Sequence, residues 1–407
     1  MNKQKIIENA RRDMDKYLRV AAPVAESNLR RVLEAFRAER VSAQHFQPST
    51  GYGYNDAGRD KLEALYARYF GAEAALVRQQ IASGSHAICC ALAGNLLPQD
   101  ELLCLGMPYD TLQTVIGIKS IGAGSLREQG VSCRVLDIDF AKPDAALIAS
   151  QIRPETKIVA IQRSCGYTDR PALSVAQIGE LCAAIHAASP SVIVFVDNCY
   201  GEMVEEREPS HVGADLLAGS LIKNIGAGIA PAGGYIAGRE ELVERAAYRL
   251  TIPGGGRELG ATLSDNRNFY QALFLAPQIV LEAQLGAVFV ASVFAQLGYR
   301  VHPAADAPRS DIVQTVYLGD AELLKAFCRG IQKYSPLDSF VSPEPWPMPG
   351  YANDIIMAAG GFIAGSSIEL SADAPLREPY AVYIQGGLSR YHVIYAVENT
   401  LRDLNML

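Results

Sequence analysis

The stretch that decides the fold is VIVFVDNC, residues 192–199. Five consecutive apolar residues that end at an aspartate are typical of a strand buried on both faces of a parallel sheet. Further short apolar strands are expected at 74–77, 101–105, 133–138, 157–162 and 235–237, and helices at 85–97, 111–118 and 175–188. This alternation predicts an α/β fold whose mostly parallel sheet is covered by helices.

The flanking segments follow other patterns. Apolar residues repeat at helical spacing through residues 1–45, and a second amphipathic helix ends at Gly71. A long apolar helix is expected over 272–297, followed by strands at 312–318, 363–370 and 380–384 and a helix at 321–334. The chain therefore divides into an N-terminal helical arm (1–50), a large α/β domain (51–271), and a connecting helix with a smaller C-terminal α+β domain (272–407).

Composition excludes several classes of protein. The chain has 407 residues, of which 49% are hydrophobic, and its 44 acidic and 37 basic residues give a net charge of −7. That composition is globular, and the acidic balance argues against a nucleic-acid partner. The apolar stretch 273–297 contains Pro277, Gln278 and Glu282, so a buried helix is favoured over a membrane span. Eight cysteines without a CxxC pair, and no export signal, indicate the cytoplasm.

Common ligand motifs are missing from the sequence. The glycines near 122 and 254 do not complete GxGxxG, and neither a phosphate-binding GxxxxGK[ST] loop nor a GxSxG nucleophile turn occurs. Cys182 and His186 have helical spacing but no plausible third ligand, and the neighbours Cys89 and Cys90 cannot both face one metal from a helix. We therefore expect no metal site.

Two residues carry the strongest chemical signal. Asp197 ends a buried strand, where open α/β sheets bind ligands, although an aspartate there is also an ordinary helix cap. Lys223 stands between apolar residues and glycines in SLIKNIGAG, residues 220–228. A desolvated lysine has a lowered pKa and becomes a nucleophilic amine, whereas a lysine at the surface would have no such role.

Two further features are weak when taken alone. Ser83, Gly84 and Ser85 precede a helix, and small residues at a helix N-terminus can bind an anion or simply cap the helix. Tyr109 in MPYDT, residues 107–111, follows a strand end. It could stack on a flat ligand or be a half-buried tyrosine.

Together these features describe a site for pyridoxal 5′-phosphate. The cofactor needs an amine for its aldehyde (Lys223), a carboxylate at its ring nitrogen (Asp197) and a partner for its ring face (Tyr109). The phosphate needs a cradle, for which Ser220 adds a hydroxyl to the small residues at 83–85. The joint pattern is far more specific than any of its parts.

The sequence resembles the fold-type I pyridoxal-phosphate enzymes of the Cys/Met metabolism group, and most of all the methionine gamma-lyase-like proteins known as aluminium-resistance proteins. The resemblance extends from residue 51 to residue 389. It rests on GYGYNDAGRDKLE, SGSHAI, MPYDTLQTVIG, IQRSCGY, VDNCYGE, GSLIKNIGAG, GGYIAG, TIPGGGRELG and YAVYIQGGLS.

The resemblance implies roles for further residues. Tyr52 and Tyr54 match a Tyr-x-Arg element that reaches the phosphate of a neighbouring subunit, with Tyr54 in place of the arginine. It therefore implies a homodimer or homotetramer with shared active sites. Arg377 is expected to bind the substrate carboxylate, Arg390 is the alternative, and Arg163 is a third candidate cation or a surface ion-pair residue.

The function implied is a carbon–sulfur lyase that acts on a sulfur amino acid, as cystathionine beta-lyase or methionine gamma-lyase does. Lys223 would move the Cα proton and Tyr109 would help to protonate the leaving sulfur. One alternative is an aldolase or other lyase for a hydroxy amino acid, which a ring-stacking His86 in place of Tyr109 would favour. A binding protein without catalysis is a further alternative.

Overall fold

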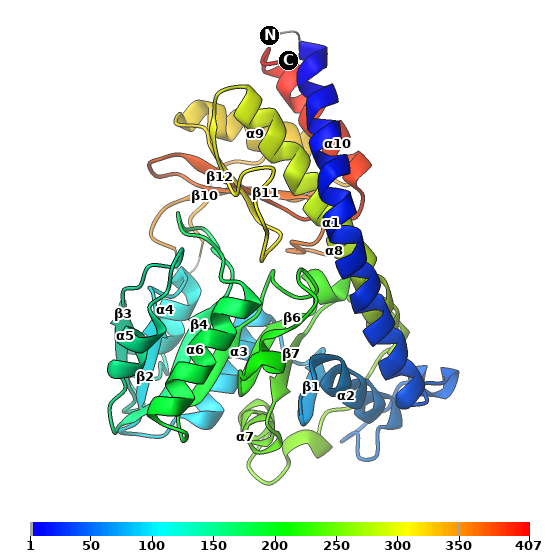
Figure 1. The fold of residues 1–407 in the computed structure, drawn as a ribbon. Coiled ribbons are helices and arrows are strands. Elements are labelled where there is room, and N and C mark those ends of the chain that lie inside the picture. Colours follow the sequence, from blue (N-terminus) through cyan, green and yellow to red (C-terminus); the bar gives the residue numbers. More distant parts are fainter. Residues whose placement is uncertain (1–2, 349–350) are drawn as a thin grey trace.

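The computed structural model describes residues 3–348 and 351–407 and places two sheets one after the other along the chain (Figure 1). The first sheet has seven strands in the order β1-β7-β6-β5-β4-β2-β3. Their bounds are Ala74–Arg78 (β1), Glu101–Leu105 (β2), Ser132–Leu136 (β3), Thr156–Gln162 (β4), Ile193–Asp197 (β5), Leu216–Ser220 (β6) and Gly234–Gly238 (β7). Only β7 runs against its neighbours, so the sheet is mostly parallel, as the sequence predicts.

Helices bury both faces of this sheet. One face packs on α3 (Gly84–Asn95), α4 (Asp110–Ile116) and α7 (Glu240–Leu250). The other packs on α2 (Ala57–Phe70), α6 (Val175–Ala188) and the first half of α8 (Arg267–Gln296), with the short α5 (Ala145–Ser150) beside α6. Burial on both faces explains the continuous apolar runs in the strands, because neither face meets water.

The second sheet is antiparallel, in the order β10-β11-β12-β9-β8. Its strands are Arg300–His302 (β8), Gln314–Tyr317 (β9), Ile355–Ala358 (β10), Ser371–Pro375 (β11) and Ala381–Gln385 (β12). Helices α9 (Ala321–Lys333) and α10 (Arg390–Asp403) share its apolar core. The two sheets follow each other in the order of the two expected domains, whose boundaries remain a prediction.

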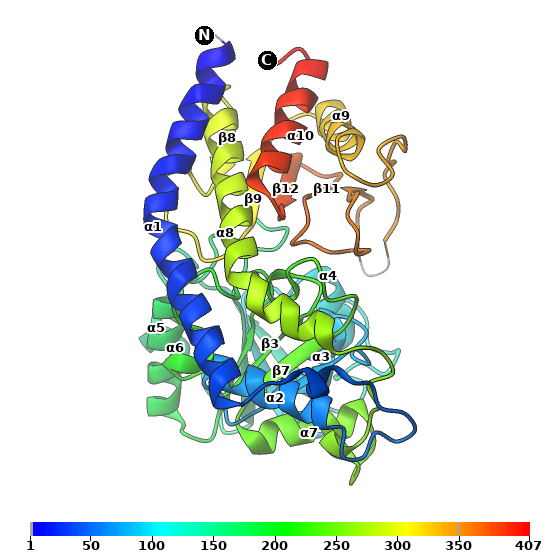
Figure 2. The same cartoon turned by 90° about the vertical axis from the view of Figure 1, so that its right-hand side faces the viewer.

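Helix α1 (Lys3–Ala38) lies side by side with α8 along the length of the molecule, and both span the level of the two sheets (Figures 1 and 2). Among the described residues, α8 is the one helix long and apolar enough to cross a membrane, but it is mostly buried inside the protein. It is a core helix, as the polar residues in its sequence predict.

Several expectations need correction. The strand expected over 363–370 is wrong: this segment forms turns, and the strands lie on either side of it at β10 and β11. Glycines and serines interrupt the segment, whereas β11 has Ser371 and Asp373 in alternation with alanine and so lacks the apolar signal of a strand. The expected N-terminal helix divides into α1 and a short 3₁₀ turn at Ala43–Phe46.

Candidate active site

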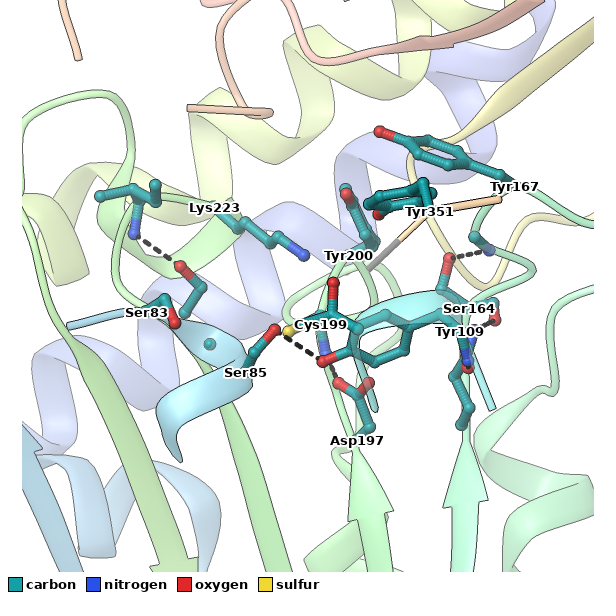
Figure 3. Close-up of a pocket in the computed structure, with 16 residues that line it drawn as sticks. Ser83, Ser85, Tyr109, Ser164, Tyr167, Asp197, Cys199, Tyr200, Lys223 and Tyr351 are labelled. Carbon is teal, nitrogen blue, oxygen red and sulfur yellow. Dashed lines mark hydrogen bonds between the residues drawn. The ribbon is translucent and has the colours of Figure 1, made fainter. Parts of the chain in front are cut away.

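A cavity of about 220 Å³ opens at the carboxyl ends of the parallel strands, beneath the second sheet (Figure 3). The side chains on its floor come from the carboxyl ends of several strands of the first sheet and from the connections that follow them, where ligands bind in folds of this type. The lining residues are Ser83, Gly84, Ser85, Tyr109, Thr111, Gln162, Ser164, Gly166, Tyr167, Asp197, Cys199, Tyr200, Ser220, Ile222, Lys223 and Tyr351.

Asp197 is the last residue of β5 and is held in register with Gln162 of β4. Its side chain is 5% exposed, and its Oδ1 accepts a hydrogen bond from the Cys199 amide at 3.1 Å. Burial raises the pKa of the Asp197 carboxyl above its ordinary value, while the Lys223 amine and the Cys199 thiol and amide act to lower it. The carboxylate is therefore costly here unless a cation lies beside it.

Lys223 lies three residues beyond the end of β6, where the chain turns sharply into a short 3₁₀ helix, Asn224–Gly226. The turn requires a glycine, since a Cβ at Gly226 would lie 1.6 Å from the carbonyl oxygen of Leu221. The glycines after Lys223 thus serve the close turn that directs its side chain into the cavity (Figure 3).

The Lys223 amine lies over the ring of Tyr200, 3.7 Å from the ring centroid. The expectation of a lowered lysine pKa is wrong for the cavity as it stands. Burial alone would lower the pKa of the Lys223 amine, but Cys199, Tyr200 and Asp197 surround it and together raise that pKa above its ordinary value. The acidic neighbours outweigh desolvation because four of them, including Tyr109, act on one amine.

The residues expected to form a phosphate cradle, 83–85, lie at the start of α3 and line the cavity. Ser83 is the N-cap, and its Oγ accepts a hydrogen bond from the His86 amide at 3.1 Å. Gly84 faces across the cavity floor, where an added Cβ would lie 3.1 Å from the Cβ of Ser220 and 3.3 Å from the sulfur of Cys199. The missing side chain leaves room for an anion against a helix N-terminus.

Tyr109 is the N-cap residue of α4 and follows β2. Its hydroxyl shares a 2.8 Å hydrogen bond with Ser85, so the ring stands beside the cradle (Figure 3). Burial raises the pKa of the Tyr109 phenol, which keeps it protonated at neutral pH. His86 does not line the cavity, and its Nδ1 accepts from the Ala82 amide at 3.0 Å, whereas Tyr109 does line it.

The three arginines singled out in the sequence have different surroundings. Arg163 is fully buried and binds Asn198 at 2.8 Å and Glu205 at 2.9 Å behind the cavity, so the structure does not bring it to the site. Arg390 is bound by Glu282 at 2.7 Å, away from the cavity lining.

Arg377 lies at the edge of the site. It is exposed, and its Nη2 donates to the main-chain oxygen of Tyr167, a lining residue, at 3.0 Å.

Tyr52 and Tyr54 lie outside the cavity of their own chain. They are 73% and 60% exposed, and their rings pack on each other with centroids 5.6 Å apart. The two rings together form a small exposed apolar cluster on this face of the chain.

Three lining tyrosines were not singled out from the sequence. Tyr167 follows β4, Tyr200 follows β5, and Tyr351 comes from the long loop between α9 and β10. The motifs IQRSCGY and VDNCYGE contain the first two, and their position after strand ends was the available signal. Tyr351 had none, because it lies in a proline-rich loop.

A mostly parallel seven-stranded sheet followed by a smaller antiparallel sheet is the fold of the fold-type I class. A pyridoxal-5′-phosphate-dependent protein from Escherichia coli, YhfS, shares the fold at 17% identity, with a TM-score of 0.61 and coverage of 93% of this chain and 96% of that one.

The family model for methionine gamma-lyase matches residues 3–405. The chain belongs to the methionine gamma-lyase family, and it is an enzyme, a carbon–sulfur lyase. The resemblance seen in the sequence is confirmed.

Close relatives match over nearly the whole length. The Bacillus subtilis protein YnbB is 50% identical over 94% of this chain and 91% of its own. A structure from Listeria monocytogenes, provisionally named a cystathionine beta-lyase involved in aluminium resistance, has 48% identity, a TM-score of 0.95 and coverage of 98% and 99%. A carbon–sulfur lyase involved in aluminium resistance from Clostridium novyi has 46% identity, a TM-score of 0.95 and coverage of 99% and 96%.

Proposed function

We propose that the protein binds pyridoxal 5′-phosphate in this cavity and eliminates a thiol from a sulfur-containing amino acid. The observation that carries the proposal is that Asp197, at the end of β5, and Lys223, in the connection after β6, line one cavity together with Gly84. An amine, a buried carboxylate and an anion site are the three groups that this cofactor needs.

The residues present fit the cofactor. Lys223 would bind its aldehyde, Asp197 would pair with its ring nitrogen, and Tyr109 would cover its ring face. The small residues Ser83, Gly84 and Ser85 and the hydroxyl of Ser220 would hold the phosphate. A Cβ at Gly84 would fill the cradle, which supports an anion rather than a side chain as its occupant. When bound, the cofactor's ring accepts the electrons left at Cα when the proton is removed.

The protein side chains then perform the proton transfers and the positioning. Lys223 would take the proton from Cα, and the Tyr200 ring beneath its amine would favour the ammonium that forms. Tyr109, protonated at neutral pH, donates to the leaving sulfur. Arg377 turns from the Tyr167 carbonyl to the substrate carboxylate.

The assembly would be a homodimer or homotetramer. We propose that Tyr52 and Tyr54 complete the cradle of a neighbouring subunit, which their exposure in the single chain supports. A phenol can hydrogen-bond a phosphate but cannot neutralise it, so the cradle would depend more on the helix N-terminus than on an arginine. We also propose the cytoplasm as the location, because the eight cysteines are all free.

The test is the absorption spectrum of the purified protein before and after borohydride. We expect a yellow chromophore that borohydride removes, and a cofactor mass fixed on the peptide that carries Lys223. Assays with cystathionine, methionine and threonine then separate elimination of a thiol from cleavage of a hydroxy amino acid. A colourless protein that binds no added cofactor would contradict the proposal.

A further inference from the structure

Tyr167 joins the two sheets at the cavity. It belongs to the connection after β4, yet its hydroxyl lies 2.6 Å from Oδ2 of Asp373 on β11. Its main-chain oxygen accepts from Arg377, which follows β11. Tyr167 is thus held at its side chain by the carboxylate of Asp373 and at its backbone by the guanidinium of Arg377. Both partners belong to the part of the chain around the second sheet.

The pair with Asp373 fixes which way the Tyr167 proton points. A phenol has one proton and two lone pairs, and a carboxylate can only accept. While Asp373 is ionised, the Tyr167 proton is directed to Oδ2. The phenol oxygen then offers only lone pairs to anything else in the cavity, and the negative charge behind it makes them stronger acceptors.

Asp373 can accept more hydrogen bonds than the described residues donate to it. Its side chain is 3% exposed, Oδ2 accepts from both Tyr167 and Gln385, and Oδ1 has no partner among the described residues. A buried carboxylate oxygen without a donor is costly. Burial raises the pKa of Asp373 to about 6, so the carboxyl is mostly ionised at neutral pH. The hydrogen bonds that Asp373 accepts and the charge of Lys223 both favour the ionised form.

We propose that Tyr167, oriented by Asp373, is a substrate-binding residue that accepts a hydrogen bond from the ammonium of the incoming amino acid. The inference rests on the proposed function and names Tyr167 as the residue that binds the substrate's amino group before the reaction. The positive charge of Arg377 and the negative charge of Asp373 both lie next to Tyr167. An α-amino acid whose amine has not yet reacted carries a carboxylate and an ammonium, so it has one group to match each charge.

The test uses protein treated with borohydride, in which the cofactor stays fixed to Lys223 and the ligand cannot become covalently attached. Calorimetry compares norleucine with hexanoate, which has the same carbon chain and carboxylate but no ammonium. We expect the unaltered protein to prefer norleucine by about tenfold, and Tyr167→Phe to bind the two within about threefold of each other.

The matched control is Tyr383→Phe. Its ring lies beside that of Tyr167, with centroids 5.2 Å apart, but Tyr383 does not line the cavity. We expect this variant to keep the preference for norleucine. Equal weakening of both ligands in Tyr167→Phe would show a merely structural role and overturn the proposal.

Steady-state kinetics give a second measurement. Asp373→Asn keeps a hydrogen-bond acceptor for Tyr167 but loses the charge, so KM for the amino acid should rise by about three- to tenfold while kcat changes less than twofold. A fall in kcat with unchanged KM would contradict the role in binding. If the protein holds no cofactor, borohydride adds no mass. In that case norleucine and hexanoate are compared on the untreated protein. Failure of the proposed cofactor is therefore distinguished from failure of the proposed role of Tyr167.

Discussion

The amine of Lys223 lies 3.7 Å from the centre of the Tyr200 ring. Tyr200 adopts a left-handed backbone conformation, with φ of 68°, which a bulky residue rarely takes. Strain of this kind persists only where the surroundings impose it, and it gathers at functional sites. The turn after β5 thus places an aromatic face under the amine that follows β6, so two adjacent strand ends build the reactive centre together.

Replacement of Lys223 by alanine should give a colourless protein. Without the amine no side chain can bind the aldehyde, and activity should fall by a factor of about 10³ or more. The absorption spectrum and the rate of thiol release from methionine or cystathionine measure the two effects. A yellow variant with full activity would remove Lys223 from the site.

Replacement of Gly84 by alanine should fill the cradle, because the new Cβ would press on Ser220 and Cys199 at 3.1 and 3.3 Å. We expect the affinity for pyridoxal phosphate to fall about three- to tenfold. Titration of the cofactor-free protein measures it, and pyridoxal without phosphate is the control ligand. If the affinity for pyridoxal falls as much, the cradle does not bind the phosphate.

Arg377→Gln should raise KM for the amino acid by about tenfold or more, since a guanidinium and a carboxylate form paired hydrogen bonds. Arg300→Gln is the matched control. Neither arginine is among the lining residues, and both contact the connection after β4. Arg377 donates to Tyr167, which lines the cavity, whereas Arg300 binds Asp169 at 3.0 Å, which does not. We expect KM of this control to stay within about twofold. Equal effects of the two changes would exclude Arg377 as the carboxylate ligand.

Hybrid dimers that contain one Tyr54→Ala subunit and one Lys223→Ala subunit should recover activity that the separate variants lack. Tyr54→Ala would damage a neighbour's cradle and Lys223→Ala its own site. If the variants assemble at random, half of the dimers are mixed, and each mixed dimer has one intact site. Roughly a quarter of the native sites should therefore return. Refolding of the mixture, followed by an activity assay, measures this. No recovery from a mixture shown to contain hybrid dimers would mean that Tyr54 serves its own subunit.

Glu202 should make the protein less stable as pH rises. It is fully buried, and burial raises the pKa of its carboxyl from 4.5 to about 8. Between these values the folded protein holds a proton that the unfolded chain releases. The free energy of unfolding should therefore fall by about 1.4 kcal/mol per pH unit from this group.

Glu202→Gln should lose this dependence of the free energy of unfolding on pH. The control is Glu180→Gln, at an exposed position on α6, which should keep it. Denaturant titrations at pH 5 to 8 measure the free energies. The same slope in all three proteins would show that Glu202 is ionised in the folded state.

Local sequence patterns were enough to predict the fold class and the main chemical groups. The run at 192–197 predicted a buried strand, because five apolar residues in water would be unfavourable and the run is short and rich in β-branched residues. A polar residue at its end was therefore expected at the edge of the sheet. The same local logic predicted Lys223, Tyr109 and the start of α3, and the structure brings all of them to one cavity.

The surroundings of these groups depend on contacts between segments far apart in the chain. Periodicity does not report which distant segments meet, so Tyr351 and the link from Tyr167 to Asp373 were not foreseen. Arg163 has the position of a site residue in the sequence, but its buried partner Asn198 directs it behind the cavity. The pKa of Lys223 likewise depends on acidic groups from other strand ends, because electrostatic interactions act through space and not along the chain.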